Sequence, residues 1–570
     1  MSVGASPISQ QRQDIDPVLV EIVRNGVIAL TEEMKINLTR TAYNMIIYEA
    51  LDFTVGLYTV EGDTISIGLG LPSFIRGMSE TVKAKVAHFG IENIHPGDIL
   101  VTNDAFITGS HLNHITLTKP VFWHGRVVAF TCCMAHWIDI GGSKGEVTTD
   151  IYSEGVQVPI LKFRSGGKIN EDFLSFIKLN VRMVDHAMGD LRAQVTAVET
   201  GEKRMLEMLQ RHGHETVLAA IEDIMDHSDK VAREKAALIP DGVYEAESFM
   251  DDDGVSIGER LPVRVRVEVA NGEVTVDLSG VSPQVKGYYN SAGATGIACA
   301  QVAFKCLTTP DIYPVNDGAF RSLKVICPQG TAISAKRPAA MRWWMTIPMT
   351  VVDTIIKAVA PAVPHLTAGG HHADLCVAQF HGSNPRSGRF FVGVVGPSGG
   401  GWGATAVSDG NPVTVCSNDG DTHNSPSEQV ETKYPILIER YALREDSGGA
   451  GEFRGGLGAD IVIRALAPVE LSTAIERCHC APWGVMGGQP GAANRLSIAT
   501  ADGWEILENG KTSNMALEPG DRIRIETGGG GGFGDPQLRQ RESVISDVRE
   551  GYVSAERAHE LYGFPQEAPR

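Results

Sequence analysis

The sequence predicts a mixed α/β (α+β) protein built from several subdomains. Its 570 residues exceed the roughly 100–200 residues of a single domain. Stretches with apolar residues at helical spacing are interleaved with short apolar or alternating runs typical of strands. Glycine is abundant, at 63 residues, and dense glycine clusters punctuate the chain after residue 393. We therefore expect a helical and mixed-sheet N-terminal part and a β-rich, glycine-punctuated C-terminal part.

The N-terminal part begins with an amphipathic helix predicted for residues 17–45. Asp16 is a suitable N-cap, and Pro17 suits the first helical position, where its missing N–H is not needed. Residues 52–58 then predict a strand, and residues 78–89 predict a second helix.

Strand and helix signals continue through the rest of this part. The apolar runs 99–101 and 127–130 predict buried strands, and the polar segment 102–113 between them predicts an irregular loop. Three further helices are predicted, for residues 173–188, 191–211 and 215–227, the last two separated at Gly213.

A boundary near Pro240 is followed by a strong hairpin signal. Valines alternate with polar residues in 263–269, Asn271-Gly272 supplies a turn, and apolar residues alternate again in 274–278.

Two more helices are predicted, for residues 292–307 and 347–359. The expected regions are 1–240 (N-terminal α/β, with the candidate metal site), 241–335 (hairpin and helix), 336–460 (glycine-rich α/β) and 461–570 (β-rich, with a helical tail).

Composition argues against several classes of function. Fifty Lys and Arg against 69 Asp and Glu give a net charge of −19, unlike a nucleic-acid binder or a basic membrane-surface protein. No stretch reaches the roughly 18 apolar residues of a membrane span, and the N-terminus lacks the apolar core of a secretory signal. The nine cysteines show no disulfide-scaffold spacing. Together these features predict a globular cytoplasmic protein with reduced thiols.

The densest group of metal-capable residues contains His111, His114 and His136. His111 and His114 stand on a loop that enters a strand, and His136 follows the apolar run 127–130. A chain that leaves on one strand and returns on its neighbour would bring the three imidazoles together. Three neutral imidazoles suit a divalent metal and leave a position open for water or substrate. The alternative is three separate polar residues, because two histidines three apart are common by chance.

Nearby carboxylates complete this candidate site. Asp52, on the preceding predicted strand, is a candidate ligand. Asp104 and Asp139 are candidates for orienting the histidines or for acting as the catalytic base.

Other candidates are weaker. The glycine runs 399–403 and 528–534 lack the Gly-Lys-Ser/Thr of a phosphate loop, so tight turns are favoured. Cys478-His479-Cys480 lacks the second pair of a zinc motif, and residues 371–374 (His-His-Ala-Asp) form a polar loop. Arg342-Trp343-Trp344 suits core packing better than an aromatic wall. No Gly-x-Ser-x-Gly elbow is present, which argues against a serine hydrolase.

Several motifs in order resemble the hydantoinase B/oxoprolinase family over nearly the whole chain, from about Asp16 to Pro536. They are Asn103-Asp104, Gly109-Ser110-His111-Leu112, Ala135-His136, Asp139-Ile140-Gly141-Gly142, Pro314-Val315-Asn316-Asp317-Gly318-Ala319-Phe320-Arg321, Thr422-His423-Asn424-Ser425-Pro426, Asp446-Ser447-Gly448-Gly449-Ala450-Gly451, Arg454-Gly455-Gly456-Leu457-Gly458, residues 528–532 and Gly534-Asp535-Pro536.

The resemblance implies one subunit of an ATP-dependent hetero-oligomer. A hydantoinase A-type partner with an actin/hexokinase-like fold would bind ATP with Mg and phosphorylate an amide or enol oxygen. The B-type subunit would hold a divalent metal, Zn or Mn, and complete the reaction. N-methylhydantoinases, 5-oxoprolinases and caprolactamase open cyclic amides, whereas the related acetone and acetophenone carboxylases add bicarbonate-derived carbon to a ketone.

Carried over by position, His111 and His136 match two metal ligands of the family, and Asp52 matches a carboxylate segment. His114 departs from the pattern, because the family usually has aspartate there. A neutral ligand in place of an anion leaves the centre about one charge more positive, which acidifies bound water further and leaves the identity of the metal open.

Three functions therefore follow from the sequence. The first is a subunit for ATP-dependent hydrolysis of cyclic amides, and the second is a subunit of a ketone carboxylase. The third is a scaffold without chemistry of its own, which would tolerate loss of all three histidines.

Overall fold

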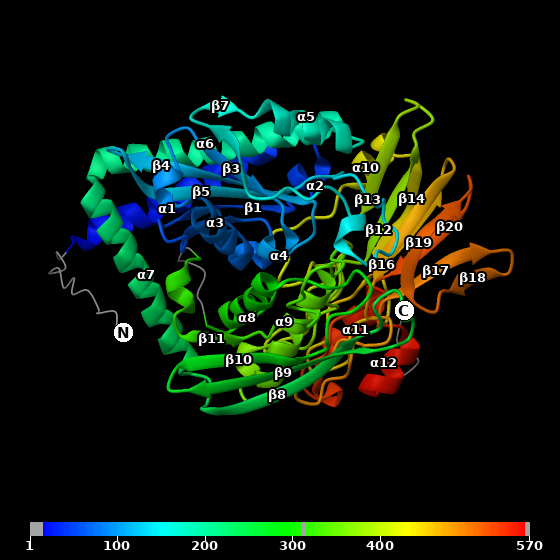
Figure 1. The fold of residues 1–570 in the computed structure, drawn as a ribbon. Helices are drawn as coiled ribbons and strands as arrows, with labels where there is room; N and C mark the ends of the chain where they lie inside the picture. The colour runs from blue at the N-terminus through cyan, green and yellow to red at the C-terminus, as the bar shows by residue number, and fades with distance from the viewer. Residues whose placement is uncertain (1–14, 309–314, 565–570) are drawn as a thin grey trace.

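Figure 1 shows the computed structural model, which describes residues 15–308 and 315–564. Pro314, which opens one of the sequence motifs, and the first 14 residues lie outside these ranges. The described chain contains four β-sheets with helices packed between and around them, so the predicted mixed α/β fold is confirmed. Within these ranges no helix is both long and apolar enough to cross a membrane.

An antiparallel N-terminal sheet carries the candidate site. Its strands lie in the order β2-β1-β5-β4-β3-β6-β7. Their bounds are β1 Phe53–Tyr58, β2 Thr64–Leu69, β3 Ile99–Thr102, β4 His114–Trp123, β5 Arg126–His136, β6 Leu161–Ser165 and β7 Lys168–Ile169. Helices α1 and α6 cover one face and α3 lies against the other (Figure 1). Every residue of β1 is buried, because helices cover both faces of the sheet at this strand.

The helices of this part largely follow the predictions. They are α1 Pro17–Thr41, α2 Met45–Tyr48, α3 Ile75–Phe89, α4 Ala105–Thr108, α5 Glu171–Asn180, α6 Val184–His212 and α7 His214–Ala236. Asp16 caps α1 by accepting the N–H of Val18 at 2.9 Å, and Gly213 separates α6 from α7. Helix α7 then runs from the N-terminal sheet to the second sheet (Figure 1).

The predicted end of the first helix at residue 45 was wrong. The helix stops at Thr41 because a buried carboxylate from α6 captures the backbone that would continue it. Asp190 accepts the N–H of Tyr43 at 2.8 Å and that of Asn44 at 3.1 Å. Asn44 then caps the short helix α2.

The boundary predicted between residues 188 and 191 was also wrong, for the same reason. The break falls between α5 and α6, at residues 181–183. There Asp139 accepts the backbone N–H of Arg182 and, at 3.0 Å, that of Met183. A carboxylate distant in sequence therefore ends one helix and starts the next.

The predicted hairpin forms the centre of the second sheet, which has the order β11-β10-β9-β8. Its strands are β8 Gly242–Met250, β9 Leu261–Ala270, β10 Glu273–Val281 and β11 Leu323–Ile326. Asn271 and Gly272 turn the chain with positive φ angles of 53° and 77°, as an Asn-Gly hairpin turn requires. The alternate valines of β9 are buried, and α9 (Thr346–Val359) packs against β8 and β9, with α8 (Gly293–Thr308) against α9.

Two further sheets make the C-terminal part β-rich, as predicted. One has the order β13-β12-β16-β19 and the other β14-β15-β20-β17-β18. The strands are β12 Val377–Ser383, β13 Phe390–Val395, β14 Ile436–Leu443, β15 Ala459–Ala465, β16 Val469–Ile475, β17 Arg495–Thr500, β18 Gly503–Ile506, β19 Gly510–Leu517 and β20 Arg522–Glu526. The remaining helices are α10 Ser427–Lys433, α11 Arg541–Arg549 and α12 Ala555–Tyr562. Short 3₁₀ turns are η1 Pro72–Phe74, η2 Ile91–Asn93, η3 Ile151–Ser153, η4 Asp317–Phe320, η5 Pro364–Leu366 and η6 Pro536–Leu538.

The glycine clusters pack backbone against backbone. The N–H of Gly401 donates to the carbonyl of Gly528 at 2.8 Å, and that of Gly530 donates to Gly456 at 2.9 Å. A Cβ on Gly530 would lie 1.8 Å from the carbonyl oxygen of Trp402, so a side chain does not fit there. The backbone groups of the two glycine runs, 399–403 and 528–534, are therefore used in contacts with other backbone, which supports tight packing over a phosphate loop.

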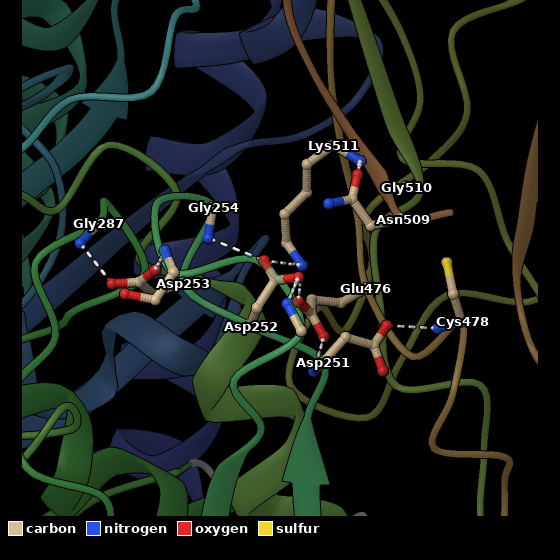
Figure 2. Close-up of polar contacts among 12 residues, drawn as sticks. Asp251, Asp252, Asp253, Gly254, Gly287, Glu476, Cys478, Asn509, Gly510 and Lys511 are labelled. Carbon is tan, nitrogen blue, oxygen red and sulfur yellow. Dashed lines mark hydrogen bonds and ion pairs between the residues drawn. The ribbon is translucent and has the colours of Figure 1, made fainter. Parts of the chain in front are cut away.

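A buried charge cluster ties the second sheet to the C-terminal part (Figure 2). Lys511 of β19 lies 3.1 Å from Asp252, just after β8, and forms an ion pair with Glu476, just after β16. All three side chains are at most 2% exposed. Burial alone would lower the pKa of Lys511, but Glu476 and Asp252 raise it, so the ammonium group stays charged.

The neighbouring carboxylates of this cluster accept hydrogen bonds from backbone N–H groups. Asp251 accepts the N–H of Cys478 at 2.7 Å and that of His479 at 3.0 Å, and Asp253 accepts the N–H of Gly287 at 2.9 Å (Figure 2). The Cys478-His479-Cys480 segment is thus a turn fixed by a carboxylate. Its thiols are free, as are those of the other seven cysteines.

Replacing Lys511 by methionine leaves Asp252 and Glu476 buried without their cation. We expect Lys511→Met to lower the free energy of unfolding by about 3–5 kcal/mol. Differential scanning calorimetry measures this as a lower unfolding temperature. The matched control is Lys230→Met, at a side chain 72% exposed, where the change stays within about 0.5 kcal/mol. Equal unfolding temperatures for the two variants would contradict the assigned role of the ion pair.

Candidate metal centre and its pocket

Strand pairing brings the candidate ligands together. In the β4–β5 hairpin His114 lies directly opposite His136. β1 pairs with β5 on its other side, so Asp52 precedes β1 beside His136, whose N–H donates to the Asp52 carbonyl at 3.2 Å. His111 stands on the loop between α4 and β4. The expectation that adjacent strands gather the three histidines is met.

The three imidazoles are in mutual contact. Ring centroids lie 4.4 Å apart for His111 and His114, 5.0 Å for His111 and His136, and 5.3 Å for His114 and His136. Asp52 Oδ1 lies 3.1 Å from His114 Nε2.

Hydrogen bonding leaves each ring with an unpaired nitrogen. His111 Nδ1 lies 2.9 Å from the carbonyl oxygen of Arg342. Because a carbonyl only accepts, Nδ1 carries the proton and Nε2 presents its lone pair. Nε2 of His111 is buried without a partner, as are Nδ1 of His114 and Nδ1 of His136. Each of the three rings therefore has a nitrogen available to a cation.

The electrostatics keep at least two of these rings neutral. Burial, together with the neighbouring imidazoles, lowers the pKa of His111 well below its usual value. Burial also lowers the pKa of His136 to about 4, against an opposing effect of Asp52. Burial pushes the pKa of Asp52 upward, but His114 and His136 outweigh it and hold the pKa below its usual value. Neutral imidazoles beside an ionised carboxylate are the donor set that divalent transition metals prefer.

The rings are not arranged as a finished coordination site. Across residues 15–308 and 315–564, no group of three or more His, Cys, Asp or Glu side chains is placed to hold a metal ion. A cation would require the donor atoms to turn toward a common point.

A largely apolar pocket opens against this cluster, with an empty volume of about 870 Å³. Asp52, His111 and His136 line it, whereas His114 does not. Its remaining walls include the apolar residues Ile46, Leu71, Ile138, Met345, Leu375, Val377, Val392 and Val394.

The Arg342-Trp343-Trp344 segment also forms part of this pocket wall. Trp343 and Trp344 are buried, and Trp344 stacks on Phe74 at 5.6 Å and meets His111 edge-on at 6.3 Å. The segment is therefore both core packing and an aromatic wall.

Asp419 is a pocket carboxylate that the sequence analysis missed. Its side chain is 1% exposed, and neither carboxylate oxygen has a hydrogen-bond partner. Burial raises the pKa of Asp419 well above its usual value, and Asp52 adds to this effect. A buried carboxyl group without partners in a pocket is a candidate for handling protons. Its closeness in sequence to the Thr422–Pro426 motif was the signal available.

The two carboxylates predicted to be catalytic lie elsewhere. Asp104 caps α4 through the N–H of Phe106 and pairs with Arg337 at 2.6 Å. Asp139 pairs with Arg182 at 2.9 Å besides accepting backbone N–H groups. Neither lines the main pocket, although Asp139 lines a smaller cavity beside it.

Residues 371–374 fold into the core beside the segment of Asp419. His371 Nδ1 accepts the N–H of Ala373 at 3.0 Å, and the ring of His372 lies 3.7 Å from Cys416 Sγ. Neither histidine lines the main pocket.

Comparison with known proteins decides the family. The sequence profile described as hydantoinase B/oxoprolinase matches residues 16–536. The chain belongs to the hydantoinase B/oxoprolinase family. It is 31% identical to the putative D-/L-hydantoinase B-type subunit of Pseudomonas sp. (strain NS671), over 98% of this chain and 96% of that protein.

A second relative of this hydantoinase B/oxoprolinase member is the caprolactamase beta subunit of Pseudomonas jessenii, 31% identical over 96% of each chain. The crystal structure of ATP-dependent caprolactamase from that organism matches with a TM-score of 0.89 at 28% identity, covering 97% of this chain and 96% of that one. An acetone carboxylase in its nucleotide-free state shares the fold, with a TM-score of 0.88 at 19% identity, over 96% of this chain and 79% of that one.

In this member of the hydantoinase B/oxoprolinase family, Glu154 fixes the loop that orients His111. Glu154 Oε1 accepts the N–H groups of Met341 and Arg342, each at 2.8 Å, and the hydroxyl of Thr148 at 2.7 Å. Its other oxygen is buried without a partner, and burial raises the pKa of Glu154 to about 7.

This raised pKa predicts a pH-dependent stability. The folded state holds the proton of Glu154 up to about pH 7, whereas the unfolded state loses it near pH 4.5. The contribution of Glu154 to the stability of the wild type therefore falls as pH rises through this window, by about 3 kcal/mol, and is constant above it. Glu154→Gln keeps the accepting oxygen and lacks the titration. We expect the melting temperature of Glu154→Gln to rise relative to that of the wild type as the pH increases from about 4.5 to about 7.

The control for this measurement is Glu234→Gln, at a side chain 63% exposed, whose difference from wild type stays flat with pH. A flat difference for Glu154→Gln would show that Glu154 titrates alike in both states.

Proposed function

We propose that this chain is the B-type subunit of an ATP-dependent hydrolase of cyclic amides, active with an A-type ATP-binding subunit. The observation that carries the proposal is the cluster of three imidazoles with Asp52 beside a largely apolar pocket, which Asp52, His111 and His136 line. The names of the hydantoinase and caprolactamase relatives support cyclic amides as the substrate class and a multi-subunit, ATP-dependent enzyme.

The proposal assigns ATP and Mg to the partner. The glycine runs of this chain lack the Gly-Lys-Ser/Thr of a phosphate loop, and their backbone groups bond to one another. An amide carbonyl is a weak electrophile because nitrogen donates electrons into it. Phosphorylation of its oxygen by the partner gives the carbon a good leaving group.

The proposed metal ligands are Asp52, His111, His114 and His136, and their unpaired nitrogens and ionised carboxylate fit a divalent ion such as Zn or Mn. When bound, such an ion acts as a Lewis acid and lowers the pKa of water. His114 supplies a neutral ligand where the family usually supplies an anion, so this centre carries about one more positive charge.

The side chains of the pocket perform the rest of the chemistry in this proposal. The apolar walls hold the ring and exclude bulk water. Water adds to the activated carbon and one of its protons goes to the ring nitrogen. The ring C–N bond then breaks, its electron pair goes to nitrogen, and the proton of the new hydroxyl group replaces the proton that Asp419 gives up as the acyl carbonyl forms. Asp419, kept protonated by burial, gives that nitrogen its second proton. The acyl phosphate that remains is hydrolysed to a carboxylate and phosphate.

The first test removes two candidate ligands. We expect His111→Ala/His136→Ala to lose the near-stoichiometric Zn or Mn of the wild type and to abolish lactam or hydantoin turnover by the complex with its A-type partner. Mass spectrometry measures the metal, and chromatography measures the ring-opened amino acid. His88→Ala, on the exposed end of α3, is the matched control and should change neither.

Two outcomes would reject this proposal. Unchanged cyclic amide turnover in a folded double variant would leave the histidines without a role and favour the scaffold. Turnover that requires bicarbonate and releases no ring-opened amino acid would favour ketone carboxylation.

The second test concerns the proton donor. Asp419→Asn removes the ionisable group from the pocket and should lower kcat by about 10²–10⁴-fold, with metal content unchanged. Asp104→Asn is the control, because Asp104 pairs with Arg337 outside the pocket, and its loss should be less than tenfold. A larger loss in Asp104→Asn or Asp139→Asn than in Asp419→Asn would return the catalytic role to the carboxylates predicted from the sequence.

A further inference from the structure

A smaller cavity adjoins the main pocket, with an empty volume of about 240 Å³. We call it the annex. The two spaces share Asn113, Ile138, Arg342, Gln379 and Val392 as lining residues. The annex is therefore continuous with the wall of the pocket beside the imidazole cluster.

Cationic side chains gather around the annex. Arg342, Arg182 and Lys144 line it, and of these Arg182 is already paired with Asp139. Arg342 Nε is buried and has no hydrogen-bond partner. A buried guanidinium group with an unused donor is costly unless a ligand supplies the acceptor.

The carboxylates near Arg342 do not use up its charge. Glu146 accepts the N–H groups of Lys144 at 2.8 Å and Gly145 at 3.1 Å. Glu154 accepts backbone N–H groups and is held partly protonated by burial.

A neutral donor completes the annex. The side chain of Ser143 is buried and lines the cavity, and its Oγ has no hydrogen-bond partner. Two polar side chains without partners therefore border one small cavity, and both can donate hydrogen bonds.

We propose that the annex binds the phosphoryl group of an O-phosphorylated cyclic amide, with Arg342 and Ser143 as its donors. This inference rests on the proposed function and names the form in which the substrate enters the site. A phosphoryl group presents several anionic acceptor oxygens to fixed donors, and a guanidinium group matches their geometry. The ring of the same molecule then occupies the apolar main pocket.

Arg342 links this subsite to the candidate metal centre. Its side chain lines both spaces, and its carbonyl oxygen holds His111 at 2.9 Å. The residue that recognises the phosphoryl group thus also orients one imidazole, so the activated carbon is held beside the cluster.

The test is isothermal titration of the purified full-length chain with inorganic phosphate, after removal of metal by a chelator. We expect Arg342→Met to weaken phosphate binding at least tenfold, with Arg342→Lys retaining more affinity because its charge is kept. Ser143→Ala should weaken phosphate binding several-fold. If Arg342→Met does not fold, this variant tests the proposed subsite in its place. Arg386→Met, on an exposed loop, is the matched control and should bind as wild type.

Three results would overturn the proposal. One is equal phosphate affinity in wild type, Arg342→Met and Ser143→Ala. Another is phosphate binding only after metal loading, equally in the Arg342 variant, because the ion would then be the anion site. The third is acetate binding as tight as phosphate binding, which would make the annex a carboxylate site. None of these three binding results depends on enzyme turnover. A failure of the proposed hydrolase function in the His111→Ala/His136→Ala experiment can therefore be distinguished from a failure of the phosphoryl subsite.

Discussion

The candidate centre depends on the register of one hairpin. Pairing of β4 with β5 sets His114 opposite His136, and pairing of β1 with β5 sets Asp52 beside them. A slip by one residue would turn these side chains to the other face of the sheet. Such a slip would also expose apolar side chains, because most residues of all three strands are buried. Burial of the sheet therefore fixes the geometry of the histidines.

Around this sheet, buried carboxylates accept hydrogen bonds from backbone N–H groups. Asp190 holds the chain after α1, and Asn44 in turn donates to the carbonyl of His136 at 2.9 Å. Asp139 sets the break between α5 and α6, and Glu154 sets the loop of Arg342. Each carboxylate recovers solvation lost on burial by accepting N–H groups. The loops that frame the pocket are thereby fixed by contacts distant in sequence.

This dependence on distant contacts explains what the sequence could and could not predict. The hairpin at Asn271-Gly272 follows from local alternation and turn chemistry, and the meeting of the histidines follows from strand order. For Asp419 the sequence offers only closeness to the Thr422–Pro426 motif, because the importance of this residue lies in being unpaired within a pocket assembled from other segments. Asp104 and Asp139 sit in motifs with metal-capable residues, but arginines far along the chain engage them. Neither carboxylate lines the main pocket, and their catalytic role stays a prediction.

The interlocked glycine loops bear on how the protein is made. Gly528 and Gly530 bond to backbone of Gly401 and Gly456, residues synthesised much earlier. The C-terminal sheets likewise combine strands from before and after the loops. The ribosome must therefore synthesise the chain through Gly530 before the glycine loops and the C-terminal sheets can complete their pairing. Until then, strands that pair with later segments keep unpaired edges. Chaperones therefore have most unpaired strand to protect while the C-terminal part of the chain is being synthesised.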